Sequence, residues 1–174
     1  MESLPFSKIK FKGMASKKWI KDFRIFEHIN NGDEVVVGLL ILCKSTGRVF
    51  LIQRNDRNQY WSLLSGGYDP NQDHNYLDCI RREMGEELRF KNLSSIDIKR
   101  GGDEYIKSKN RNFKYFFGFV DREFSVILDD ENLHWGWFDP NGKSIIDNQF
   151  NTFGLPKDLY PGLIQKIQAI FSTY

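Results

Sequence analysis

Apolar runs alternate with short polar segments along the chain, and the apolar runs predict strands. Residues 35–43 form an almost unbroken apolar run rich in β-branched residues, and residues 49–52 form a second one. The polar segment 44–48 between them contains a glycine, so we predict a hairpin of two buried strands. Further strands are predicted at 60–64, 96–100, 105–106, 113–120, 124–128 and 133–138, with turns at 101–103 and 139–142.

Helical spacing occurs in two places. Ile80, Met84 and Leu88 recur every four residues, with Tyr76 and Leu77 in the preceding turn, which predicts a short helix with one apolar side. The tail at 158–171 is predicted to form a second helix that docks on the sheet. Its apolar residues share one stripe, and its proline falls in the first turn, where proline is tolerated. These residues are Leu159, Pro161, Leu163, Ile164, Ile167, Ile170 and Phe171.

Length and composition fit one folded domain. The 174 residues are 40% hydrophobic, and we place the domain at 34–174, after an N-terminal extension at 1–33. Residues 19–26 of that extension carry apolar groups at both odd and even positions, which predicts a strand that completes the sheet or crosses to a second subunit, giving a homodimer. The net charge of +2 is too small to indicate a nucleic-acid-binding protein, despite a basic excess in the first 24 residues.

The cysteines and the apolar runs bear on the compartment. Cys43 and Cys79 have the spacing of neither a zinc site nor a disulfide framework, so we expect a reducing environment. No apolar run reaches about 18 residues, and no leader with a cleavage site precedes the domain. The expectation is therefore a cytoplasmic protein without a membrane partner.

The candidate chemistry lies on the first predicted helix. Glu83 and Glu87 are within ~40° of each other at about 100° per residue, and Glu86 is ~60° from Glu83 on its other side. The helix follows a predicted turn at Gly66 and Gly67. Three carboxylates on one arc repel each other unless a cation lies among them, and oxygen ligands suit Mg²⁺ or Mn²⁺. This pattern predicts a divalent-metal site that binds phosphate.

At these residues the chain resembles the Nudix hydrolases. Their box reads Gly, five residues, Glu, seven residues, Arg-Glu, an apolar residue, any residue, Glu-Glu, any residue, Gly and an apolar residue. Here it runs from Gly67 to Phe90; residues 82–87 match its core, and residues 61–67 resemble the tryptophan-to-double-glycine strand end that precedes it. The resemblance implies an α/β/α sandwich on a mixed β-sheet, with the box helix and a C-terminal helix.

Three departures from the box concern its loop and its end. The segment between Gly67 and Arg82 is one residue longer than the family spacing, and either Asp73 or His74 replaces the first glutamate. Arg89 stands where the family has its closing glycine, so we expect the helix to continue to Asn92.

The resemblance also implies roles for residues of the box. Glu83 and Glu87 are expected to bind the metal directly, Glu86 to be a ligand or the general base, and the Gly66 carbonyl to be a further ligand. Arg82 is expected to orient the glutamates by ion pairing. An acid from a distant loop often joins the site in this family, and Glu131, in the acidic run 129–131, is the candidate; the alternative is that this run is a solvated turn.

Candidates for substrate binding lie around the box. Arg54 and Arg57 follow the second strand and are placed to meet a distal phosphate, while Gly67 and Tyr68 adjoin the metal site. An aromatic ring could stack on a base, although each such ring is more often part of a core. The candidates for stacking are Trp19, Phe23, Tyr68 and Trp135.

The predicted reaction is hydrolysis of a phosphoanhydride bond in a nucleoside diphosphate linked to another moiety. The predicted metal is Mg²⁺, with Mn²⁺ as the alternative. Substrates of this kind are nucleotide sugars such as ADP-ribose, nucleoside triphosphates and dinucleoside polyphosphates. A capped RNA ranks lower, because no long basic face is visible. The alternative class is a catalytically silent module that binds a nucleotide or a protein. Three mutually repelling carboxylates favour the enzyme, because their cost is offset when a metal is recruited.

Overall fold

The structure is a computed structural model that describes residues 34–140, 155–156 and 158–174. The extension at 1–33, with its predicted strand, Trp19 and Phe23, lies outside the described residues. The strands are β1 (Glu34–Cys43), β2 (Arg48–Arg54), β3 (Trp61–Ser62), β4 (Leu64–Gly67), β5 (Asp97–Ile106), β6 (Arg111–Val120) and β7 (Asn132–Phe138). The helices are α2 (Tyr76–Leu88) and α3 (Leu163–Thr173), with short 3₁₀ turns at Leu93–Ser95 and Lys107–Lys109.

The strands form one mixed sheet of seven strands around β1. β1 pairs in parallel with β6 along its whole length, from Glu34 opposite Arg111 to Cys43 opposite Val120, and antiparallel with β2 and β4. A strand in this position is covered on both faces, which explains why its sequence is an unbroken apolar run. β7 adds to β2, and β5 adds to β6 at the far edge.

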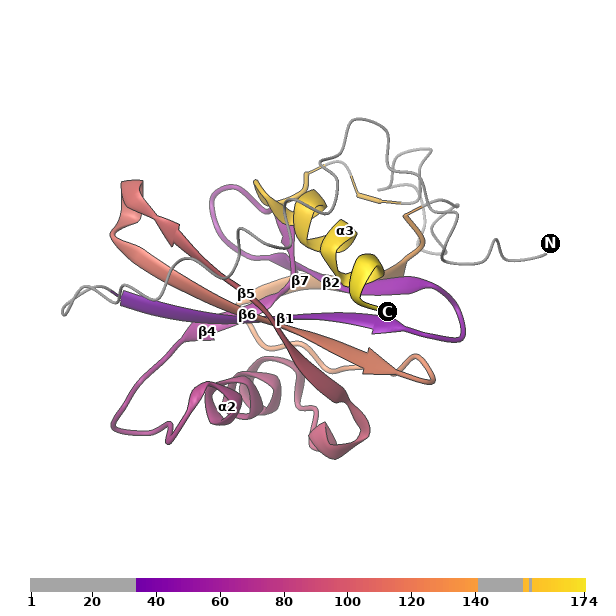
Figure 1. The fold of residues 1–174 in the computed structure, drawn as a ribbon, viewed down its shortest axis with the longest axis horizontal. Coiled ribbons are helices and arrows are strands. Elements are labelled where there is room, and N and C mark those ends of the chain that lie inside the picture. Colours follow the sequence, from indigo (N-terminus) through magenta and orange to yellow (C-terminus); the bar gives the residue numbers. More distant parts are fainter. Residues whose placement is uncertain (1–33, 141–154, 157) are drawn as a thin grey trace.

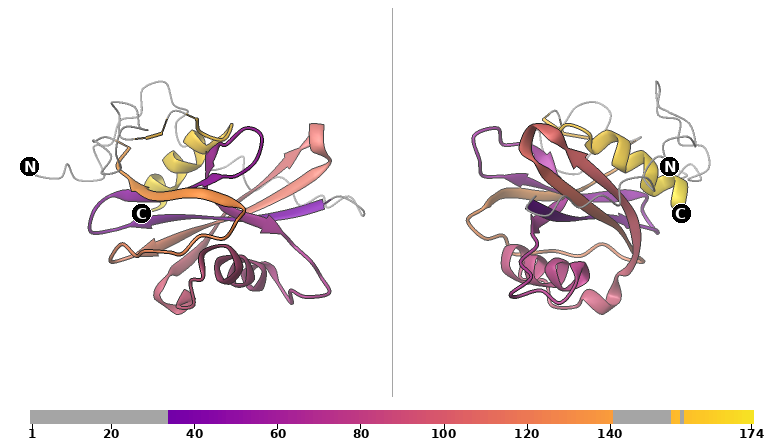
Figure 2. Two further views of the ribbon diagram at one scale, coloured as in Figure 1. Left: turned by 180° about the vertical axis from the view of Figure 1, so that it is seen from behind. Right: turned by 60° about the vertical axis from the view of Figure 1, so that its left-hand side comes forward.

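The two helices cover opposite faces of this sheet (Figure 1). Val37, Leu39 and Ile41 of β1 belong to the core that packs against α2, whereas Leu40 and Leu42 belong to the core that packs against α3. This alternation along one strand separates the two cores. The views in Figure 2 show the same three layers. The predicted α/β/α sandwich on a mixed sheet, with a box helix and a C-terminal helix, is therefore confirmed.

Most predicted strands are present, but three segments differ. The hairpin of β1 and β2 and the strands at 113–120 and 133–138 are confirmed. The segment 60–64 instead divides into β3 and β4, and the predicted turn at Gly66 and Gly67 is wrong because both glycines pair with β1 inside β4. The predicted strand, turn and strand between 96 and 106 form one strand with a bulge between Arg100 and Gly102, since the extra residue can be absorbed without breaking the pairing.

The predicted strand at 124–128 does not form. Its backbone is bound to the end of α2 instead, because the amide of Ile127 donates to the carbonyl of Leu88 and the amide of Asp129 donates to the carbonyl of Glu87. The ring of Phe124 packs on Phe50 and Phe90. The alternating apolar residues of this segment therefore cover the α2 core without pairing in the sheet.

α2 ends at a residue with left-handed backbone conformation, and α3 begins directly after one. Arg89 has φ 49° and ψ 30° and ends α2, so the predicted continuation to Asn92 is wrong. The amides of Arg89 and Phe90 both donate to the carbonyl of Met84, which satisfies that end of the helix without a glycine. α3 begins at Leu163 after Gly162, with φ 87°, so Pro161 precedes the helix and is not in its first turn. No described helix is long and apolar enough to cross a membrane.

Candidate active site

The start of α2 and its apolar face fix the direction of the carboxylates. The side chain of Asn75 caps the helix by accepting from the amide of Asp78 at 2.9 Å. Ile80, Met84 and Leu88 are buried in the core beneath the helix. Glu83 and Glu87 are consequently held at the edge of the sheet, beside β4, where their residues are 9% and 4% exposed.

β4 passes so close to α2 that a side chain at Gly66 would displace the carboxyl group of Glu83. A Cβ atom added to Gly66 would overlap the carboxyl group of Glu83, whereas one added to Gly67 would meet nothing within 4 Å. The Cys79 thiol donates to the Gly67 carbonyl at 3.5 Å, and burial raises the pKa of this thiol to about 12, which keeps it protonated. The backbone of β4 is thereby joined to α2.

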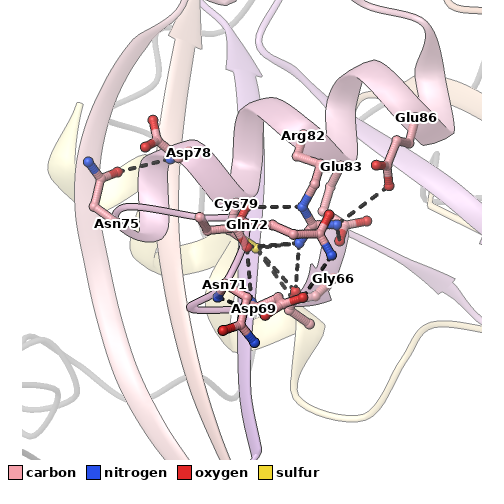
Figure 3. Close-up of polar contacts among 12 residues, drawn as sticks. Gly66, Asp69, Asn71, Gln72, Asn75, Asp78, Cys79, Arg82, Glu83 and Glu86 are labelled. Carbon is pink, nitrogen blue, oxygen red and sulfur yellow. Dashed lines mark hydrogen bonds and ion pairs between the residues drawn. The ribbon is translucent and has the colours of Figure 1, made fainter.

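Arg82 connects the loop, β4 and the carboxylates (Figure 3). Its Nε and Nη2 atoms bind the two oxygens of Asp73 at 3.0 and 2.9 Å, and Nη2 also donates to the Gly67 carbonyl at 2.9 Å. Its Nη1 atom lies 2.8 Å from Glu83 and 3.5 Å from Glu86. These ion pairs are what the predicted orienting role of Arg82 requires.

Asp73 and His74 have different surroundings. Asp73 is 3% exposed, and its hydrogen bonds from Arg82 hold the pKa of its carboxyl below the ordinary value. His74 is exposed. Of the two residues that could replace the first glutamate of the box, Asp73 is the one joined to the site, and the longer loop brings it there as the partner of Arg82.

Two buried carboxylates stand beside each other without enough positive charge to balance them. Burial raises the pKa of Glu83 above its ordinary value, although Arg82 opposes this effect. Burial also raises the pKa of Glu87 to about 8, and the charge of Glu83 contributes to the shift. A divalent cation between them would offset both the desolvation and the repulsion, so the residues fit such a metal.

The carboxylates are not already arranged as a closed cage. Among the residues that the structure describes, no three acidic, histidine or cysteine side chains converge closely enough to hold a metal ion by themselves. The side chain of Glu86 is 61% exposed. Mg²⁺ is commonly held by one or two carboxylates together with water and substrate phosphates. An open site based on Glu83 and Glu87 suits that mode of binding.

Asn132 is a part of the site that sequence reasoning missed. This residue is 7% exposed, and its Nδ2 atom lies 3.3 Å from Glu87 Oε2 and 3.2 Å from Asp129 Oδ1. It thus joins the acidic run to α2 across 45 positions of sequence. A single asparagine at the start of a strand does not by itself indicate this role; its position directly after the acidic run is the one hint in the sequence.

A cavity of about 810 Å³ opens beside these residues. Of the predicted site residues, it is lined by Gly66, Gly67, Arg82, Glu83, Glu86, Glu87, Arg54 and Glu131. Arg54 is also paired with Asp56 at 3.2 Å. The volume of the cavity is in the range of cavities that bind small molecules and cofactors.

Three predicted substrate-binding residues lie away from this cavity. Arg57 is in an exposed bend and is not among the lining residues. The ring of Tyr68 packs on Tyr76 at 4.9 Å, and that of Trp135 packs on Phe50 at 6.0 Å. Both rings pack against the core on the α2 side of the sheet and are not among the residues that line the cavity.

The fold and the site define a class of protein: an α/β/α sandwich in which a helix presents buried carboxylates to a cavity beside a glycine-containing strand. Residues 33–144 match the model of the NUDIX domain family. The chain therefore belongs to the Nudix family. Among curated protein sequences, no significant match to this chain was found.

Solved structures share the fold at low sequence identity. The NUDIX domain of Shewanella oneidensis NrtR, complexed with ADP ribose, is 11% identical with a TM-score of 0.60, covering 92% of this chain and 99% of that one. The Escherichia coli dihydroneopterin triphosphate pyrophosphohydrolase is 18% identical with a TM-score of 0.51, covering 61% and 80%. A bifunctional NMN adenylyltransferase/ADP ribose pyrophosphatase from Francisella tularensis, complexed with AMP and a manganese ion, is 15% identical with a TM-score of 0.58, covering 90% and 45%. The family and the fold indicate a Nudix pyrophosphohydrolase.

Proposed function

We propose that this protein is a metal-dependent hydrolase that cleaves a phosphoanhydride bond in a nucleoside diphosphate linked to another moiety. The observation that carries the proposal is the pair of buried carboxylates, Glu83 and Glu87, at the edge of a cavity of about 810 Å³. Such a pair is costly without a cation, and its position beside the cavity gives that cation access to a substrate phosphate.

The residues of the box have different roles in the site. Glu83 and Glu87 would hold the metal, with the Gly66 carbonyl as a further ligand and Glu86 as either a ligand or the general base. The bound metal supplies Lewis-acid stabilisation of phosphate charge and a more acidic water. Arg82 orients Glu83 through its 2.8 Å ion pair, while Asp73 fixes the guanidinium from the other side.

The general base is Glu86 or Glu131. Both line the cavity, and both are exposed, so that either carboxylate can accept a proton from water. Glu131 belongs to the loop that Asn55 holds, through a hydrogen bond from its backbone amide to the Glu131 carbonyl at 2.7 Å. A change of Glu131 to glutamine that leaves both the pH dependence of the rate and the metal affinity unaltered would assign this role to Glu86.

Small nucleotide derivatives are the proposed substrates, with Mg²⁺ or Mn²⁺ as the metal. Proteins of similar structure support this class: one is complexed with ADP ribose, one is a dihydroneopterin triphosphate pyrophosphohydrolase, and one from Caenorhabditis elegans is an Ap4A hydrolase. That C. elegans structure is 22% identical with a TM-score of 0.50, covering 59% of this chain and 77% of that one. Capped RNA remains the lower-ranked substrate.

One observation favours a second candidate, a silent module that binds a nucleotide without hydrolysing it. Within the described ranges, no three ligand side chains are already assembled around one point. A protein that had lost hydrolysis would retain the cavity and the ion pairs of Arg82 while its metal affinity declined. Metal binding and product formation therefore separate the two candidates.

The test is a substrate panel assayed in Mg²⁺ and again in Mn²⁺, with a chelated control. The panel contains ADP-ribose, ATP, a dNTP, a dinucleoside tetraphosphate and capped RNA. We expect release of a nucleoside monophosphate or phosphate from at least one small nucleotide, and calorimetric binding of the metal that is lost in Glu83→Gln. Tight nucleotide binding without product over hours, in both metals, would favour the silent module.

A further inference from the structure

The cavity has a second end, remote from the carboxylates of α2. It is formed by the hairpin of β5 and β6 together with the start of α3, and Figure 2 shows the tip of this hairpin on the same side of the sheet as α3. Its lining includes Glu34, Glu104, Lys109, Arg111, Phe113 and Lys166. Nothing in the roles assigned above uses this end of the cavity.

Lys166 is the most enclosed charged residue at this end. Its side chain is 6% exposed, and its Nζ atom lies 2.8 Å from Glu104 Oε2. The same atom lies over the rings of Phe113 and Tyr115, at 5.4 and 5.0 Å from their centroids. An ammonium group seldom becomes this buried for stability alone, because removing it from water has a large cost.

The ring of Phe113 forms the floor beside this ammonium group. It passes over β1 at Gly38, where an added Cβ atom would come within 2.7 Å of the tip of the ring and 2.5 Å of Leu63. The glycine thus lets the ring lie against the sheet. An aromatic floor beside a charged donor and a charged acceptor suits a group that carries both hydroxyls and apolar faces, such as a sugar.

Two ion pairs balance four of the five charged residues named at this end, and the fifth, Lys109, lies over the ring of Tyr160 at 5.9 Å. Arg111 is bound to Glu34 at 2.7 Å, and Lys166 to Glu104 at 2.8 Å. Over the whole cavity, the described lining residues include seven carboxylate side chains and five cationic ones. A divalent metal offsets this excess of acid, after which a diphosphate with two negative charges is accommodated more readily than a triphosphate with up to four.

From these observations we infer that the cavity selects a nucleoside diphosphate whose second phosphate carries a neutral, hydroxyl-bearing group, and that Lys166 and Glu104 determine specificity by binding that group. Lys166 donates to a hydroxyl oxygen, Glu104 accepts from a hydroxyl, and Phe113 supports the ring. This inference rests on the proposed function for the location of the phosphates, at the end formed by α2.

The first experiment compares Lys166→Met and Glu104→Gln with a matched control, Lys99→Met. Lys99 also lies on an aromatic ring, Phe119 at 5.3 Å, and near a carboxylate, Asp97 at 3.7 Å, but it is outside the cavity. With ADP-ribose and UDP-glucose, the two cavity variants are expected to raise KM about tenfold with kcat nearly unchanged. The control should match the wild type.

Inhibition by AMP separates binding of the attached group from other effects. AMP lacks that group, so its inhibition constant is expected to be the same in all variants. A parallel loss of AMP affinity would assign this end to the nucleoside and overturn the inference. Glu104→Gln preserves the side-chain volume at a half-exposed position. If this variant left KM unchanged for both nucleotide sugars, the inference would also be overturned, because the ion pair would then serve only to connect α3 to β5.

The second experiment compares substrates that differ in the charge of one group. ADP-ribose is expected to exceed ATP, and UDP-glucose to exceed UDP-glucuronate, by tenfold or more in kcat/KM within whichever series is hydrolysed. A preference for ATP or for the uronate would refute the inference while leaving the hydrolase intact. Conversely, calorimetric binding of ADP-ribose that depends on Lys166, without any hydrolysis, would support the inference and refute the proposed function.

Discussion

The two ends of the cavity differ in how far their carboxylates are paired with cationic side chains. At the α2 end, Glu83 and Glu87 are buried side by side, and Arg82 is shared with Asp73, so negative charge remains in excess. At the α3 end, the carboxylate of Glu104 pairs with Lys166. The first arrangement is completed by a cation from outside, whereas the second is already complete and offers hydrogen bonds. Substitutions should therefore change metal binding and turnover at the first end and substrate affinity at the second.

The largest expected effect comes from Glu87→Gln, which removes one charge from the α2 end and keeps its shape. Because a metal ligand is lost, kcat is expected to fall about a thousandfold, which corresponds to roughly 4 kcal/mol of transition-state stabilisation. The measurement is steady-state turnover at saturating Mg²⁺, with circular dichroism to verify the fold. A kcat within threefold of the wild type would remove Glu87 from the metal site.

The same variant should have the opposite effect on the stability of the metal-free protein. The pKa of the Glu87 carboxyl is about 8 in the folded protein, above its ordinary value of 4.5, so the folded state binds this proton more tightly than the unfolded state does. Its contribution to stability is thus complete below pH 4.5 and is lost as the pH rises through about 8. Thermal unfolding at pH 8–9 without metal should give a higher Tm for Glu87→Gln than for the wild type, and added Mn²⁺ should reverse the order. A wild-type Tm that stays constant between pH 5 and 9 would contradict this charge repulsion.

A smaller loss is expected from Gly66→Ala, which tests the fit between β4 and α2. The new methyl group would overlap the Glu83 carboxyl and displace this ligand, so metal affinity and kcat/KM should decrease about a hundredfold. Gly67→Ala is the matched control, because its methyl group meets nothing within 4 Å. If both variants behaved alike, the approach of the two elements would not matter for the site.

Asn132→Leu should give a further, weaker effect by removing the amide that joins Glu87 to Asp129. We expect metal affinity to fall about tenfold, since residues that orient ligands typically contribute this much. Asn55→Leu is the control: its side chain donates to the Asp130 carbonyl at 3.0 Å on the same loop but contacts no carboxylate. Calorimetry with Mn²⁺ measures both, and equal losses would assign the effect to the loop as a whole.

These two ends also differ in how far the sequence predicts them. Helical spacing and the glycine pair locate the α2 end, because Gly66, Arg82 and Glu83 are joined by one short stretch of chain. The sequence does not identify Lys166 or Asn132, since Lys166 contacts Glu104 across 62 positions and Asn132 contacts Glu87 across 45. Such contacts depend on how α3 and β7 pack, which periodicity within either segment does not report.

The wrong predictions share that cause. Residues 124–128 have the alternation of a strand, yet their backbone binds the end of α2 because the sheet offers β7 as the partner of β2. Tyr68 and Trp135 are predicted candidates for stacking, but their rings pack against the α2 core and do not line the cavity. Local pattern thus predicted the type of most elements, and tertiary packing decided which face each side chain took.

The smallest expected effect concerns the end of α2, next to the carboxylates but outside their chemistry. Arg89 holds a left-handed conformation, with φ 49°, that glycine adopts without steric cost. Arg89→Gly should stabilise the protein by about 0.5–1 kcal/mol, because the relief of strain exceeds the extra entropy of the unfolded chain. Lys91→Gly is the control, since Lys91 is equally exposed and is not among the residues with positive φ, so it should gain nothing. Denaturant unfolding measures both, and kcat should stay at the wild-type level because Arg89 is exposed and does not line the cavity. A loss of stability in Arg89→Gly would mean that the guanidinium group, and not the backbone, determines how this helix ends.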